Sequence, residues 1–193
     1  QACTSMLGSF RIAKMLLADD ESIESVLCIS ADRFPQGACY EQSFNLISDG
    51  AAAAVISREA KGFKILSCHG ITNGGLASAN DEEAAGTYFV YSHRLIMEAL
   101  AKAGVTLSQI AWIVPQNMNI KAWQILSRLL KFDETKIYAP SRPELGHVIS
   151  GDNIINLDRL GKDKDKELKS GDLILLIMAG YGMNWQCTLL EKC

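Results

Sequence analysis

The sequence predicts an α/β fold in which strands alternate with helices around a layered, mixed sheet. Apolar runs of strand length recur along the chain, and segments with apolar residues at helical spacing lie between them. The chain has 193 residues, 48% of them hydrophobic and 21% charged, which is ordinary for a globular protein with a sizeable core.

The first part of the chain is predicted to contain one helix and three strand regions. Phe10, Ala13 and Leu17 lie on one side of a helix that begins just after Cys3. Strands are expected within 25–31, 43–57 and 63–71. The second of these regions includes an Asp-Gly turn and four consecutive alanines, whose small side chains allow another backbone or a ligand to come close.

The remaining segments continue the alternation. Residues 72–87 are rich in Gly, Ala, Asn and acidic residues, which predicts a loop over a substrate entrance. Helices are expected at 88–103 and 119–130, and strands at 111–114, 136–139, 172–178 and 184–190. The charge run 162–167 is typical of a solvated helix face rather than of a binding site.

Charge and cysteine content exclude several classes of protein. The net charge of −3 leaves no basic surface for nucleic acid, and no apolar run is long enough to span a bilayer. The six cysteines show no C-x-x-C spacing, so neither a zinc site nor another metal site is expected. We expect a reduced, cytoplasmic protein.

Cys3 is the strongest candidate for a reactive side chain. It lies among small residues directly ahead of the first predicted helix, where backbone N–H groups and the helix dipole favour a thiolate. A thiolate is the form of sulfur that attacks thioesters. The alternative is a small buried cysteine that packs the start of the helix.

Four stretches of the chain, in order, carry a family resemblance. They are QACTSM (1–6), SDGAAAAV (48–55), WIVPQNMNIK (112–121), and GH (146–147) together with SGDLILL (170–176) and AGYGMNW (179–185). These stretches resemble the A-C-A-G, G-D-G-A-G-A-A-V, W-x-V-P-H-Q-A-N-x-R and G-N…F-G-G-G-x-T-W segments of the ketoacyl-ACP synthase III family of the thiolase superfamily. Each motif alone is weak, but together they span the whole chain in the family's order.

The resemblance implies a thiolase-like, layered α-β-α-β-α fold that lacks the N-terminal strands and helices of its first half. Residues 1–60 would be the remainder of the N-terminal half, and residues 61–193 the C-terminal half. Family members carry a segment ahead of the nucleophile. We therefore expect a half-sheet of only two strands, near Val26 and Ala53, with exposed apolar faces and edges. The missing segment is expected from elsewhere in a larger protein or from a partner chain.

The resemblance also implies an activity. In the family, the cysteine takes an acyl group from a CoA or carrier-protein thioester. A histidine and an asparagine then donate hydrogen bonds to a malonyl thioester carbonyl, which stabilises the enolate formed on loss of CO₂. The resemblance implies a homodimeric or heterodimeric protein. It also implies that this protein binds an acyl-CoA or an acyl carrier protein. No cofactor is expected beyond the CoA or phosphopantetheine thioester that serves as substrate.

Two of the three matched catalytic positions depart from the family pattern. Cys3 matches the nucleophile, but Gln116 stands where the family has histidine, and His147 stands where it has asparagine. A glutamine amide can donate hydrogen bonds but takes no proton near neutral pH. His147 can accept a proton, so the donor and base roles are exchanged. This change favours acyl transfer to an alcohol, amine or thiol over malonyl condensation.

Other matched positions have milder implications. Asn119 matches an asparagine that orders the family's site, although a helix N-cap is the alternative. Lys121 matches a basic residue near phosphopantetheine, although an exposed helix lysine is equally compatible. Gly180 and Tyr181 match the turn that supplies an oxyanion-hole N–H, where the family has glycine in place of Tyr181.

Two functions are compatible with these observations. The first is a synthase III-like acyltransferase that forms an acyl-cysteine and transfers or condenses the acyl group in fatty-acid or polyketide-type metabolism. The second is a catalytically silent thiolase-fold subunit that pairs with an active partner. The arrangement of Cys3, Gln116 and His147 distinguishes them, because a silent site would have Tyr181 or a loop filling the space in front of the sulfur.

Overall fold

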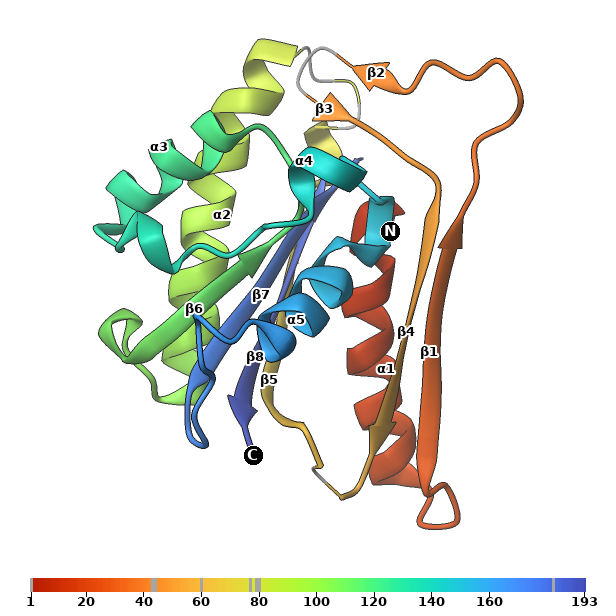
Figure 1. Cartoon of the computed structure of the whole chain (residues 1–193), viewed down its shortest axis with the longest axis vertical. Helices are drawn as coiled ribbons and strands as arrows, with labels where there is room; N and C mark the ends of the chain where they lie inside the picture. The colour runs from red at the N-terminus through yellow and green to blue at the C-terminus, as the bar shows by residue number, and fades with distance from the viewer. Residues whose placement is uncertain (1, 43–44, 60, 77, 79–80, 182) are drawn as a thin grey trace.

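The computed structural model describes residues 2–42, 45–59, 61–76, 78, 81–181 and 183–193, and these build two main β-sheets. The strands are β1 (Ser25–Asp32), β2 (Glu41–Gln42), β3 (Asn45–Leu46), β4 (Gly50–Ser57), β5 (Phe63–Thr72), β6 (Ile110–Pro115), β7 (Leu173–Gly180) and β8 (Asn184–Lys192). The larger sheet has the order β5–β8–β7–β6, and the smaller one pairs β1 with β4 (Figure 1). Strands β2 and β3 form a short antiparallel pair.

The larger sheet is mixed, as the sequence predicts. Strands β6 and β7 are parallel, whereas β8 runs antiparallel to both of its neighbours, β5 and β7. Along β7, Ile174, Leu176 and Met178 face one core, while Leu175 and Ile177 face the other. Burial on both faces explains why this strand reads as a continuous apolar run rather than as an alternation.

Helices separate and cover the sheets in layers. They are α1 (Ser5–Asp19), α2 (Asp81–Ala103), α3 (Ile120–Leu130), α4 (Arg142–Leu145) and α5 (Asp152–Lys162). Helices α2 and α3 cover one face of the larger sheet, and α1 and α5 lie between its other face and the β1–β4 pair (Figure 1). This arrangement confirms the predicted α/β class and the layering of helices and sheets.

Two hydrophobic cores correspond to these layers. One lies between the larger sheet and helices α2 and α3, and its most buried side chains include Leu95, Ile113, Leu126 and Trp185. The other lies between the two sheets around α1 and α5, and includes Met6, Leu7, Phe10, Leu160 and Leu176. Both helices of the middle layer begin next to the residues of the candidate site.

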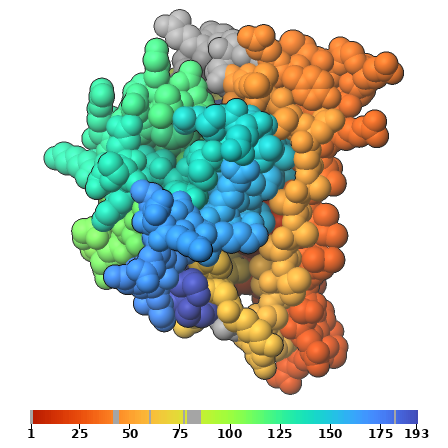
Figure 2. Space-filling model, viewed as in Figure 1, coloured from red at the N-terminus to blue at the C-terminus, as the bar shows by residue number. Residues whose placement is uncertain are grey.

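The β1–β4 pair has one covered and one open face, as expected for a half-sheet of two strands. Cys28 is buried toward α1, whereas Leu27, Ile29 and Val55 are 59%, 62% and 66% exposed. The pair forms a ridge along one side of the molecule, beside α5 (Figure 2). The predicted division into two halves at residues 60 and 61 stays a prediction.

Three local predictions were wrong. Helix α2 begins at Asp81 rather than at residue 88, because three acidic residues at 81–83 suit the first turn of a helix even though their surroundings read as a loop. The segment 136–139 makes only a single bridge, between Ile137 and Ile113, instead of a strand. The charge run lies mostly in turns after α5, which ends at Lys162.

Within the described residues, no helix combines the length and the apolar character needed to cross a bilayer.

We expect the α3 core contact to be strongly stabilising. Leu126 is fully buried on α3, whereas Leu129 on the same helix is 53% exposed. Leu126→Ala should lower the free energy of unfolding by about 2–5 kcal/mol because it leaves a cavity. Leu129→Ala, the matched control, should change it by less than about 0.5 kcal/mol. Urea unfolding of the complete protein measures both values, and equal losses would contradict the assigned packing.

Candidate active site

Cys3 lies in a short 3₁₀ helix, Ala2–Thr4, that leads directly into α1. The preceding residue, Ala2, has a left-handed backbone with φ of 45°, a conformation that costs a non-glycine residue about 1–2 kcal/mol. Thr4 is fully buried and donates a hydrogen bond from its hydroxyl to the Asn184 side chain at the start of β8. The prediction that Cys3 stands at the N-terminal end of a helix is confirmed.

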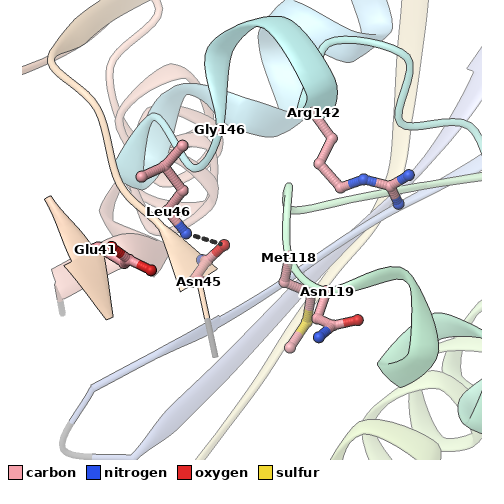
Figure 3. Close-up of a pocket in the computed structure, with 7 residues that line it drawn as sticks. All are labelled: Glu41, Asn45, Leu46, Met118, Asn119, Arg142 and Gly146. Carbon is pink, nitrogen blue, oxygen red and sulfur yellow. Dashed lines mark hydrogen bonds between the residues drawn. The ribbon is translucent and has the colours of Figure 1, made fainter. Parts of the chain in front are cut away.

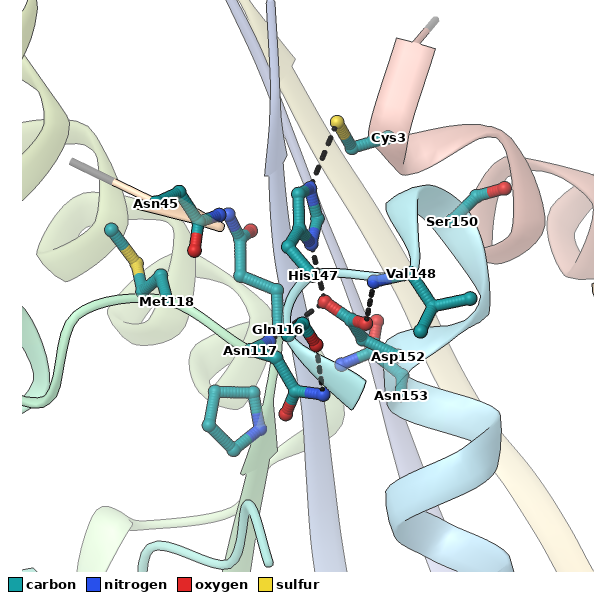
Figure 4. Close-up of polar contacts among 12 residues, drawn as sticks. Cys3, Asn45, Gln116, Asn117, Met118, His147, Val148, Ser150, Asp152 and Asn153 are labelled. Atoms are coloured by element: carbon teal, nitrogen blue, oxygen red, sulfur yellow. Dashed lines mark hydrogen bonds and ion pairs between the residues drawn. The ribbon is translucent and has the colours of Figure 1, made fainter. Parts of the chain in front are cut away.

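The structure brings Cys3 together with His147. The sulfur of Cys3 lies 3.3 Å from Nε2 of His147, which is separated from it by 144 positions in the sequence (Figure 4). On the other side of the ring, His147 Nδ1 lies 2.5 Å from Oδ2 of Asp152. Cysteine, imidazole and carboxylate therefore form a continuous chain of contacts, an arrangement typical of nucleophile activation.

Asp152 is buried and fully engaged. Its Oδ1 accepts the backbone N–H of Val148 at 2.7 Å, and its Oδ2 accepts the backbone N–H of Asn117 at the same distance. It is also the first residue of α5, where the helix dipole favours a negative charge. A carboxylate with these donors can remain ionised in the interior.

The surroundings of His147 favour its protonated form. Burial by itself lowers the pKa of His147, but the hydrogen bonds to Asp152 and Cys3 and their negative charges outweigh it. The net result raises the pKa of His147 from 6.5 to about 10. Near neutral pH the imidazole therefore holds a proton that it can deliver to a leaving group.

A close backbone contact with β3 holds the His147 loop in place. His147 donates its N–H to the carbonyl of Leu46 at 2.7 Å and accepts the N–H of Ser48 at 3.0 Å. Gly146 has φ of +65°, and a Cβ at this position would lie 2.5 Å from the Leu46 carbonyl oxygen. Gly50, in the small-residue stretch, packs against Val148, so this stretch shapes the site by close packing, as predicted.

Gln116 lies beside His147 at the end of β6 (Figure 4). It is 7% exposed, and its Oε1 accepts the backbone N–H of Ala179 at 2.5 Å. With the oxygen engaged in this way, the amide nitrogen is the donor of this side chain. The backbone N–H of the neighbouring Asn117 and the His147 ring both contact Oδ2 of Asp152. This shared contact brings Gln116 and His147 close together.

Buried asparagines connect the loops that carry these residues. Asn117 donates to Ser141 at 2.7 Å and to the carbonyl of Gly146 at 2.8 Å. Asn156 of α5 bonds both to Asn117 and to Ser141, and Asn153 donates to the carbonyls of Val114 and Ile177. Because every one of these groups is buried, each bond that is broken would leave a polar atom unsatisfied.

A pocket of about 380 Å³ opens next to Gly146 (Figure 3). Its lining comes from Glu41, Asn45, Leu46, Met118, Asn119, Arg142 and Gly146. The volume is within the range of small-ligand sites. In the described part of the chain, no group of three His, Cys, Asp or Glu side chains is arranged to hold a metal ion.

The structure places the other predicted residues as follows. Asn119 caps α3 by accepting the N–H of Lys121 and also lines the pocket, while its role in ordering the site stays a prediction. Lys121 is exposed on α3 and is not part of the pocket lining. Gly180 ends β7, and the next residue, Tyr181, is 70% exposed.

Asp152 and its asparagine partners were not foreseen from the sequence. The motifs of the family resemblance assign no role to position 152. In the sequence, Asp152 reads as an ordinary acidic residue at the start of a helix. The sequence nevertheless contained a usable signal. Asp152 follows the candidate base His147 by five residues and stands at a helix N-terminus, so a turn between them can bring the carboxylate against the ring.

Two family models match the chain. Residues 1–74 match 3-oxoacyl-[acyl-carrier-protein (ACP)] synthase III, and residues 100–192 match the model for the C-terminal part of 3-oxoacyl-[ACP] synthase III. The beta-ketoacyl-[acyl-carrier-protein] synthase III of Chlamydia caviae is 25% identical, over 99% of this chain and 64% of its own length. The Aquifex aeolicus protein of the same name is 24% identical, over 98% and 64%. The chain thus spans less than two thirds of these relatives.

Solved structures confirm the thiolase-like fold. ChlB3, described as an acyltransferase, superposes with a TM-score of 0.86 at 19% identity, over 100% of this chain and 66% of its own. The 3-oxoacyl-[acyl-carrier-protein] synthase III of Aquifex aeolicus superposes with a TM-score of 0.81 at 25% identity, over 99% and 65%.

The first prediction for the site concerns Gly146. Gly146→Ala places a methyl group against the Leu46 carbonyl in a backbone conformation that L-residues rarely adopt, so the loop that holds His147 must shift. We expect a loss of about 1–3 kcal/mol in the free energy of unfolding. The control is Gly161→Ala, since a methyl at this position of α5 meets no atom within 4 Å. An undisturbed Gly146→Ala protein would contradict the geometry of this loop.

The second prediction concerns the titration of His147. Because its folded-state pKa lies above the unfolded value of about 6.5, protonation of His147 stabilises the fold. This contribution is complete below pH 6.5 and disappears as the pH rises through about 10. NMR titration should show the His147 ring still protonated at pH 8, and His147→Asn should remove that signal.

Asp152→Asn is the companion variant for this titration. It removes the carboxylate but keeps an acceptor oxygen, and we expect the pKa of His147 to fall by about 1–3 units. An unchanged titration in Asp152→Asn would show that the carboxylate is not the cause of the raised pKa.

Proposed function

The chain belongs to the 3-oxoacyl-[acyl-carrier-protein] synthase III family, and on that premise we propose that its protein is an acyltransferase that carries an acyl group on Cys3. The donor is an acyl-CoA or acyl-carrier-protein thioester, and the acyl group is transferred to or condensed with an acceptor in fatty-acid or polyketide-type metabolism. The observation that carries this proposal is the 3.3 Å contact between Cys3 Sγ and His147 Nε2, backed by Asp152.

Loading of Cys3 uses the proton on His147. The step starts from a proton on His147 Nε2 and from the thiolate form of Cys3, the form of sulfur that attacks thioesters. The sulfur attacks the thioester carbonyl carbon and forms the new S–C bond, and the old C–S bond breaks as the leaving sulfur takes the proton from Nε2. The products are acyl-Cys3, a neutral His147 and a free thiol.

The charge that develops on the carbonyl oxygen needs donors. We assign this role to the Gln116 amide and to backbone N–H groups at Cys3 and at the turn of Gly180 and Tyr181. The support is that Gln116 and the end of β7 are joined by the Gln116–Ala179 hydrogen bond, and that β7 and β8 pack against the 3₁₀ helix of Cys3.

The pocket beside Gly146 is the proposed route for the thioester. Its lining combines the cation of Arg142 with the amides of Asn45 and Asn119, groups that suit the amides and phosphate of a pantetheine arm. Lys121, exposed at the start of α3, would contact the donor or its carrier protein outside the pocket.

We also propose a dimeric, cytoplasmic protein in which further residues or a partner chain cover the outer face of β1 and β4. The exposed Leu27, Ile29 and Val55 support this proposal, because apolar side chains grouped on one sheet face usually pack against protein.

No observation favours the silent-subunit alternative. That hypothesis requires the space in front of Cys3 to be filled, whereas the Tyr181 side chain points into solvent. It also gives no reason for a buried carboxylate placed behind a histidine that contacts a cysteine.

Intact-mass spectrometry tests the proposal directly. The complete protein is incubated with a panel of acyl-CoAs, and we expect a mass gain of one acyl group that is absent in Cys3→Ala. His147→Ala should load more slowly by about 100-fold or more, because it removes the proton transfer to the leaving group.

The matched control is Cys193→Ala, since Cys193 is an exposed cysteine that follows β8 at the end opposite Asn184. It should load like the unmodified protein. A mass gain that persists in Cys3→Ala would refute Cys3 as the acyl carrier. No gain with any donor in a folded protein would refute acyl loading and support the silent subunit.

A further inference from the structure

We propose that the acceptor is a molecule that offers a hydroxyl or amine group, which His147 deprotonates while Asp152 holds the ring behind it, rather than a malonyl thioester. This inference rests on the proposed acyl loading of Cys3. The carrying observation is that His147 lies between Cys3 at 3.3 Å and a buried carboxylate at 2.5 Å, in the position where the family has an asparagine.

The hydrogen bonds around Asp152 determine which ring nitrogen carries the lone pair. A carboxylate only accepts hydrogen bonds, and both oxygens of Asp152 already accept backbone N–H groups from Asn117 and Val148. Nδ1 of His147 is therefore the donor to Asp152. Once the proton on Nε2 has left with the thiol, acyl-Cys3 no longer carries the charge that helps to raise the pKa of His147, and Nε2 presents a lone pair toward the acyl group.

This lone pair is unsuited to malonyl condensation. An enolate oxygen needs hydrogen-bond donors, and an asparagine at position 147 would supply one without taking a proton. A neutral His147 instead directs its Nε2 lone pair, an acceptor, at the acyl group. Of Gln116 and His147, only Gln116 then offers a hydrogen-bond donor. The same lone pair is what an attacking O–H or N–H group requires.

The transfer step balances without any further reactant. The acceptor oxygen or nitrogen attacks the carbonyl carbon of acyl-Cys3 while its proton passes to Nε2 of His147. The C–S bond then breaks, and the sulfur leaves as a thiolate. The product is an ester or an amide, and the site returns to the thiolate of Cys3 paired with the protonated His147.

The adjoining pocket includes polar groups that such an acceptor can contact. Glu41, Asn45, Asn119 and Arg142 place a carboxylate, two amides and a guanidinium around about 380 Å³ of space (Figure 3). These groups can hydrogen-bond a small molecule that carries several hydroxyl or amine groups. Asn45 lies on the same side of the site as Gln116 and His147 (Figure 4).

Single-turnover discharge of the acyl-enzyme tests the acceptor class. The complete protein is loaded with an acetyl group from acetyl-CoA, separated from the donor, and mixed with ethanolamine, glycerol, malonyl-CoA or buffer alone. Loss of the acetyl mass from Cys3 is followed with time, together with the ester or amide product and the release of CO₂. An amide product identifies the amine as acceptor, and an ester identifies the hydroxyl.

We expect ethanolamine or glycerol to accelerate discharge above the buffer rate, and malonyl-CoA to release no CO₂. His147→Asn should lose this acceleration by about 100-fold or more, because asparagine donates a hydrogen bond but takes no proton. In the unmodified protein the acceleration should also rise with pH as His147 loses its proton, and this dependence should be absent in His147→Asn. His93→Asn is the matched control and should behave like the unmodified protein.

Three outcomes would overturn the inference. Discharge by malonyl-CoA with CO₂ release, faster than with the amine or alcohol, would show a condensing site. Equal rates in the unmodified protein and in His147→Asn, or no acceleration above buffer, would show that His147 is not the base. If Cys3 does not load at all, the proposed function fails together with this inference, and the loading step separates that case from the others.

Discussion

The buried carboxylate of Asp152 is the constraint on which the site depends. A charge with no exposure to solvent must be matched by donors, and Asp152 finds them in the His147 ring and in the backbones of Asn117 and Val148. These donors belong to the turn after β6, the loop after α4 and the start of the 3₁₀ turn before α5. Satisfying one charge therefore fixes three segments relative to one another.

Residues 1–60 contribute more to the site than the nucleophile. α1 lies between the two sheets, so the packing of the middle layer sets where Cys3 stands at its N-terminus. The approach to β4 pairs with His147 through Leu46 and Ser48, and Gly50 lets Val148 come close. The contact between Cys3 and His147 thus joins two segments that lie 144 positions apart in the sequence.

By resemblance, Gln116 replaces a family histidine and His147 replaces a family asparagine. These replacements change which hydrogen-bond donors and bases the site offers. Gln116 is held through its oxygen and offers a donor, while His147 is held through Nδ1 and offers a proton or a lone pair at Nε2. An imidazole at this place without Asp152 would lie buried with nothing to hold its second nitrogen or to balance its charge. The histidine and the carboxylate consequently make physical sense only as a pair.

The sequence by itself determined the α/β class, the main strands and the position of Cys3 at a helix start, because apolar runs and helical spacing are local patterns. It also placed Gln116 and His147 at matched positions through motifs that are contiguous in the chain. Only the tertiary structure showed the contacts of Asp152, the buried asparagines and the exposure of Tyr181. Such contacts join residues far apart in the sequence, and burial, which turns a surface carboxylate into an obligatory partner, is a property of the packed fold.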